Sequence, residues 1–216
     1  MATFATLLVT LATELRDPSN LVWSSTMLGR FINKALMDVG RVAPAQFAEQ
    51  VNATTDALEY TLTNGSEWVE VTRVEVWDVA ASPDAFVRLL RPLSNEYNIQ
   101  TPTGWFVWIG KLYISASQAA ELVTGTHVLK VWGYAPYAEA SGSTAMPTGE
   151  KEHAIIEGAR VQAYKSLIAS RNLFTQWQAQ GISSDLSIAA LMSELANAQD
   201  EYRRLLRSIT TLRAGF

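Results

Sequence analysis

The last long segment of the chain, residues 185–212, carries the most regular apolar pattern in the sequence. Its apolar residues are spaced alternately three and four apart, as on one face of a helix. They are Ile188, Leu191, Leu195, Ala198, Tyr202, Leu205, Ile209 and Leu212. At 1.5 Å per residue the predicted helix is on the order of 40 Å long. An isolated helix gains little stability from propensity, so this apolar seam must pack against the rest of the chain or against another protein.

Composition places the chain among ordinary globular proteins and excludes several kinds of site. Of its 216 residues 48% are hydrophobic and 18% charged, with a net charge of -4, which allows one large domain or two small ones. A pI near 5.3 disfavours tight, phosphate-driven binding of nucleic acid. The chain has no cysteine, which excludes disulfides, thiolate metal sites and a cysteine nucleophile. No stretch reaches the roughly 18 to 20 apolar residues that span a membrane.

Helical signals stand at both ends of the sequence. A first helix begins near Phe4 and ends before Asp17-Pro18, because proline keeps the preceding residue out of the helical region. Ser24 is a suitable cap for a second helix, onto which Trp23 can pack. After Pro44 we expect a short helix carrying Phe47, Ala48 and Val51. The helical period returns after residue 147, and segment 176–184, which contains Gly181, separates this helix from the final one.

Between these helices the apolar period changes to two, which is typical of strands. Asn64-Gly65 is a favoured hairpin pair, and a change of phase at Thr72-Arg73 predicts a β-bulge. Segments 105–109, 112–114 and 128–132 are apolar on both faces, so we expect both faces to be covered, by helices or by a neighbouring subunit. The predicted fold is α+β. Residues 1–57 and 147–216 form a helical bundle, 58–137 an inserted antiparallel β-rich domain, and 138–146 a connector.

Candidate catalytic residues are few, and none falls in a known motif. His127 and His153 are isolated from each other, and no Walker-type, G-x-S-x-G or G-x-G-x-x-G loop is present. A carboxylate pair drawn from Glu67, Glu70 and Glu75 would suit glycoside hydrolysis, although a solvated sheet face explains these residues better. We therefore predict no catalytic residue, no metal site, no cofactor and no enzymatic activity.

Aromatic and basic residues allow two interpretations each. Five tryptophans fall in the strand region, where they form either a core or a stacking platform for sugars. They are Trp68, Trp77, Trp105, Trp108 and Trp132. Arg203, Arg204, Arg207 and Arg213 near the end of the final helix either compensate its dipole or mark a surface for nucleic acid or an acidic partner.

The order of these elements resembles the head-to-tail adaptor (connector) proteins of tailed bacteriophages. The resemblance begins in the opening helices, with Asp17-Pro18, Trp23-Ser24, Leu28, Ile32, Asn33, Ala35 and Leu36. It continues in the aromatic strands, at residues 105–114 and 128–134 with Pro136. It ends with Met146-Pro147, Glu152, Ala154-Ile155-Ile156, Ala159 and Ala163-Tyr164.

The resemblance implies a structural virion protein, assembled in the host cytoplasm and located in the neck. Such subunits usually form rings of twelve beneath the portal, extend the channel for double-stranded DNA without reading its sequence, and dock the tail. The homo-oligomer, portal and tail contacts would then fall on the seam, the chain end and the strand tryptophans. These residues are Ile188, Leu191, Leu195, Tyr202, Leu205, Arg207, Ile209, Leu212, Phe216, Trp105, Trp108 and Trp132. The alternative is a glycan-binding or peptidoglycan-hydrolysing phage tail component.

Overall fold

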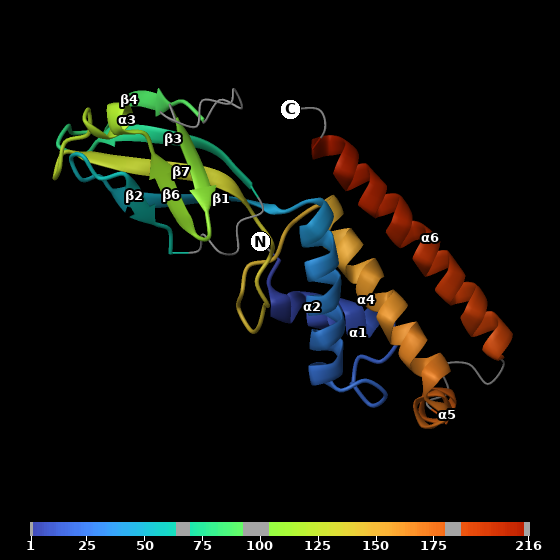
Figure 1. Ribbon diagram of the computed structural model, residues 1–216. Coiled ribbons are helices and arrows are strands. Elements are labelled where there is room, and N and C mark those ends of the chain that lie inside the picture. The colour runs from blue at the N-terminus through green and yellow to red at the C-terminus, as the bar shows by residue number, and fades with distance from the viewer. Residues whose placement is uncertain (1, 64–69, 93–103, 180–186, 214–216) are drawn as a thin grey trace. The chain divides into compact units, whose positions relative to one another are not determined.

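A computed structural model describes residues 2–63, 70–92, 104–179 and 187–213, with side chains described as far as residue 210 (Figure 1). Contacts divide the chain into two units, a helical unit of Met1–Ala43 with Tyr137–Phe216 and a sheet unit of Pro44–Pro136. The predicted α+β class, with antiparallel sheets and a long C-terminal helix, is confirmed. None of the helices in the described ranges combines the length and apolar composition that crossing a bilayer requires.

The helical unit is built around one central helix, α4. Its helices are α1 (Phe4–Glu14), α2 (Ser25–Val42), α4 (Glu150–Ala169), α5 (Arg171–Ala179) and α6 (Ile188–Arg213). Helix α4 contacts each of the other four. It can do so because apolar and small residues occupy several of its faces, among them the buried Ile155, Gly158 and Ala159. The single apolar stripes of α1, α2 and α6 then each find a partner in the same core.

Polar groups fix the turn between α1 and α2. The carboxylate of Asp17, which is almost fully buried, accepts hydrogen bonds from the backbone N–H groups of Leu21, Val22 and Trp23 at 2.8 to 3.0 Å. Ser24 Oγ accepts from the Met27 N–H at 3.3 Å, so the predicted cap is confirmed. The turn thus holds Trp23 in the core, where its Nε1 donates to Ser166 Oγ on α4 at 2.9 Å.

The sheet unit contains two antiparallel sheets that share one core. A four-stranded sheet has the order β1 (Ala45–Asn52), β7 (His127–Ala135), β3 (Glu70–Asp78) and β4 (Ala85–Leu90). A three-stranded sheet has the order β2 (Glu59–Thr61), β6 (Lys111–Ile114) and β5 (Trp105–Trp108), and the short helix α3 (Ala116–Ala119) follows β6. Val74, Val76, Leu112, Leu129 and Val131 are fully buried in the core that the two sheets share.

The strand register confirms one prediction, whereas another falls outside the described residues. The pairing of β3 with β7 shifts between Val71 and Arg73, where the change of phase predicts a bulge. The predicted Asn64-Gly65 hairpin turn lies outside the described residues.

The predicted short helix around Phe47, Ala48 and Val51 is wrong, because residues 45–52 form strand β1. Half-buried and exposed residues alternate along it, and each residue pairs with a partner on β7, about 80 positions later in the chain. Such long-range pairing leaves only a weak local signal. As a consequence the first boundary between the units falls after Ala43 rather than after residue 57.

The predicted connector belongs to the helical unit in the structure. Ala140 is buried, and its backbone exchanges two hydrogen bonds with the Asn33 side chain, at 2.9 and 3.1 Å. Residue Ala145 forms an isolated β-bridge with Thr3. Residues 138–146 are therefore tied to the bundle by specific hydrogen bonds.

Candidate assembly surfaces

The apolar seam of α6 is covered mainly by the chain itself. Leu191, Ala198, Leu205 and Ile209 are buried in the helical core, where α6 packs along α4 (Figure 1). The seam residues Leu195 and Tyr202 are half-buried against the same core. Ile188, at 58% exposure, is the exposed member of the seam up to residue 210. The side chains of Leu212 and Phe216 lie outside the described residues.

Tyr202 contributes an unusual polar group to this packed interface. Its hydroxyl is buried and has no hydrogen-bond partner within the described part of the chain. Burial, with a smaller contribution from the charge of Asp38, raises the pKa of Tyr202 to about 12. The ring itself contacts the backbone of α4 at Gly158, which leaves no room for a larger residue there. Tyr202 therefore acts as a packing residue between helices.

Acidic neighbours compensate the arginines of α6. Arg203 Nη1 lies 3.1 Å from Asp200 Oδ1, and Arg204 Nε donates to Glu201 Oε2 at 2.8 Å. The hydrogen bond from Arg204 holds the pKa of Glu201 below its usual range. Arg207 is exposed one turn further on. These ion pairs, each between residues three apart, offset the charge of Arg203 and Arg204 and so reduce their attraction for DNA phosphates.

Glu75 organises the outer face of the four-stranded sheet. Its carboxylate is almost fully buried, and its Oε2 accepts hydrogen bonds from the Nε1 groups of Trp77 and Trp132, both at 2.9 Å. Arg73 Nε lies 3.1 Å from Glu75 Oε1, so the carboxylate has three donors. Strands β3 and β7 bring these residues together by their pairing, although Trp132 is 57 positions from Glu75.

Cations lie over the two indole rings of this cluster. The guanidinium of Arg73 is 4.7 Å from the ring centroid of Trp132, and Lys130 Nζ is 3.8 Å from that of Trp77. Such contacts stabilise both partners. In each indole ring a cation covers one face and the N–H donates to Glu75. The rings of Trp77 and Trp132 are therefore poorly suited to stacking against a sugar.

Of the other tryptophans in the strand region, the structure describes Trp105 and Trp108, which differ in exposure. Trp105 is buried, with Nε1 donating to the Leu90 carbonyl at 3.0 Å, and Trp108 is 63% exposed at the end of β5. Trp68 and Glu67 fall outside the described residues. Phe86 and Leu89 on the edge strand β4 are each 54% exposed. They were missed because β4 is exposed along most of its length and shows no alternation of buried and exposed residues.

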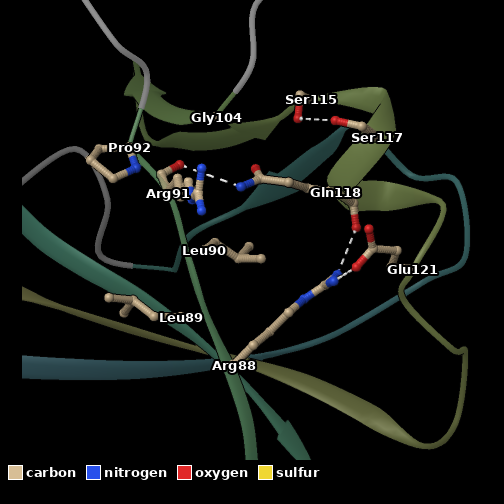
Figure 2. Close-up of a pocket in the computed structure, with 10 residues that line it drawn as sticks. All are labelled: Arg88, Leu89, Leu90, Arg91, Pro92, Gly104, Ser115, Ser117, Gln118 and Glu121. Atoms are coloured by element: carbon tan, nitrogen blue, oxygen red, sulfur yellow. Dashed lines mark hydrogen bonds and ion pairs between the residues drawn. The ribbon is translucent and has the colours of Figure 1, made fainter.

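The polar pocket in Figure 2 lies between β4 and the α3 region. Its volume is about 590 Å³, and Arg88 crosses it to form an ion pair with Glu121 and to donate to the Gln118 carbonyl at 3.2 Å. The hydroxyls of Ser115 and Ser117 lie 3.2 Å apart, and no histidine lines the pocket in the described part of the chain. The carboxylate in this lining, Glu121, is held by its ion pair with Arg88.

The histidines occupy unrelated positions. His127 Nδ1 accepts a hydrogen bond from the Val123 N–H at 3.1 Å in the turn before β7, whereas His153 is exposed in the first turn of α4. Over the described ranges, no three histidine or acidic side chains gather closely enough to hold a metal ion. No protein-family model matches this sequence, and no curated protein matches it either.

Proposed function

We propose that the chain is a head-to-tail adaptor, a structural virion protein whose ring lies beneath the portal of a tailed bacteriophage. In this role it extends the DNA channel and presents the surface on which the tail docks, at the neck of the virion. One observation carries the proposal. The sheet unit leaves large apolar side chains exposed at two places, Phe86 with Leu89 on β4 and Trp108 with Ile109 at the β5–β6 turn.

Exposed apolar groups of this size are typical of surfaces that meet other proteins. The helical unit covers most of the seam of α6 internally, so the sheet unit offers the better support for assembly. Aromatic and arginine side chains are also enriched at the centres of protein interfaces, and the outer sheet face holds Trp77, Trp132 and Arg73 in fixed positions.

Charge supports the same function. A channel must let DNA slide, so its wall cannot hold many phosphates at once. The net charge of -4 and the paired arginines of α6 suit such a wall. The resemblance to adaptors also includes a helical bundle with an inserted antiparallel sheet, which is the fold class of this chain.

Native mass spectrometry and negative-stain microscopy test the proposal. The purified chain is measured alone and after addition of purified portal protein. We expect a ring in at least one of the two conditions, because docking on a portal can supply the template for assembly. A chain that stays monomeric both alone and with portal protein would contradict the proposed function.

A further inference from the structure

The turn between β5 and β6 combines backbone strain with apolar exposure. Trp108 pairs with Lys111, so Ile109 and Gly110 form a two-residue turn, and their φ angles are 45° and 73°. Two positive φ angles are characteristic of a type I′ turn, which favours Asn-Gly. A β-branched residue is strained in this region. An isoleucine at position 109 is therefore unfavourable in this turn.

The Ile109 side chain is not buried in the core of its own unit. It is 82% exposed, and the neighbouring Trp108 is 63% exposed. An asparagine would suit both the turn and water better, so neither local geometry nor core packing accounts for an isoleucine here. We call Trp108 and Ile109 the hairpin tip. A strained turn that projects two large apolar side chains suits insertion into an apolar cavity.

The helical unit provides such a cavity where α4, α5 and the start of α6 meet. Its volume is about 540 Å³, and its apolar lining includes Leu167, Ile168, Phe174, Ile188 and Leu191. Ile168 and Ile188 are 40% and 58% exposed, so its rim is open to water. We call this the corner cavity. Arg171 is the charged residue of its lining over the described residues, and the remaining lining residues are neutral.

We propose that the hairpin tip of one copy inserts into the corner cavity of a second copy. The two features are both apolar and belong to different units of the chain, so a contact between two copies is heterologous and can repeat from copy to copy. The charge nearest to the tip is already neutralised, because Lys111 Nζ lies 2.5 Å from Glu59 Oε1. This inference rests on the proposed function, because a repeating heterologous contact that closes produces a ring.

Cysteine cross-linking tests the pairing directly, because the natural chain has no cysteine. Two variants, Ile109→Cys and Ile188→Cys, are prepared with tags of different mass, mixed, and oxidised both alone and in the presence of purified portal protein. We expect a disulfide-linked heterodimer, and a ladder of linked oligomers from the double variant. Ile109→Cys mixed with Leu21→Cys, whose exposed residue lies outside the cavity lining, is the control. A heterodimer yield no higher than in this control would overturn the inference, as would an intramolecular disulfide alone in the double variant.

Ile109→Asn separates assembly from stability. Asn suits the turn, so this variant should melt at a higher temperature than the natural chain while its ring formation falls at least tenfold. Leu58→Asn is the matched control, because Leu58 is 50% exposed and lies beside β2, away from the turn. It should assemble normally. If Ile109→Asn assembles as the natural chain does, the tip contact is wrong although the ring remains. If the natural chain itself never assembles, the proposed function fails.

Discussion

The contact between α2, α4 and α6 at Gly158 makes a quantitative prediction about the bundle. A Cβ at Gly158 would lie 2.9 Å from Ala35 Cβ and 2.9 Å from Tyr202 Cε2. Real Cβ atoms do not approach so closely, so some group must move. The Tyr202 ring can rotate, but Ala35 Cβ is fixed to the backbone of α2, so that helix itself must shift.

Two opposing effects set the result of Gly158→Ala. Alanine favours the helix over glycine by about 1 kcal/mol. Overpacking of a close-packed core costs about 1–3 kcal/mol, and the rigid contact with Ala35 places this site near the upper end. We therefore expect a net loss of about 1–2 kcal/mol in the free energy of unfolding, or a decrease of about 2–8 °C in melting temperature for a chain of this size.

Gly29→Ala is the matched control, because it makes the same substitution inside α2. There the nearest neighbour is the tip of the Phe4 ring, with Cζ at 3.2 Å, and this ring can give way. We expect Gly29→Ala to be neutral or to stabilise the chain by up to about 1 kcal/mol. Urea denaturation followed by circular dichroism measures both variants, and the midpoints are compared at constant slope.

A double-mutant cycle identifies the atom responsible. Ala35→Gly removes the rigid Cβ, so in its presence Gly158→Ala should lose most of its cost, with a coupling energy of about 1–2 kcal/mol. If Gly158→Ala and Gly29→Ala stabilise the chain equally, the close approach of the three helices is wrong.

Three further changes test other parts of the structure. Asp17→Ala leaves buried N–H groups without an acceptor and should lower the free energy of unfolding by about 2–4 kcal/mol. Urea denaturation measures this change, and a smaller decrease would mean that water replaces the carboxylate as acceptor. The pKa of Tyr202 is about 12 in the fold against 10.0 ordinarily, so the unfolded chain ionises first and stability should fall as pH rises from 10.0 towards 12. Tyr202→Phe should remove this part of the loss of stability at alkaline pH and should change the stability little near neutral pH. An unchanged dependence of stability on pH would refute this role of Tyr202. Glu75→Gln places an amide donor among the indole and guanidinium donors, so the free energy of unfolding should fall by about 1–3 kcal/mol. Denaturation followed by tryptophan fluorescence measures this change, and an unchanged midpoint would contradict the hydrogen-bonded cluster.

The predictions of helices and of the fold class were confirmed where they depend on residues close together in the sequence. The seam of α6, the cap at Ser24 and the end of the first helix before Asp17-Pro18 each depend on residues within one or two turns. The bulge in β3 left a change of phase in its own strand and was found for the same reason. Strand β1 was missed because its stability comes from pairing with β7, a partner distant in sequence.

The chemistry of the surfaces depends on neighbours that the chain order does not reveal. Periodicity predicts that the α6 seam is apolar, but the choice of α4 as its partner follows from packing in three dimensions. Glu75 looks like any solvated acid in a strand, yet pairing of β3 with β7 brings two indole donors to it. Spacing along one element reports which side chains share a face, because the backbone repeats regularly. What covers that face depends on contacts between distant segments, and these leave no periodic trace in the sequence.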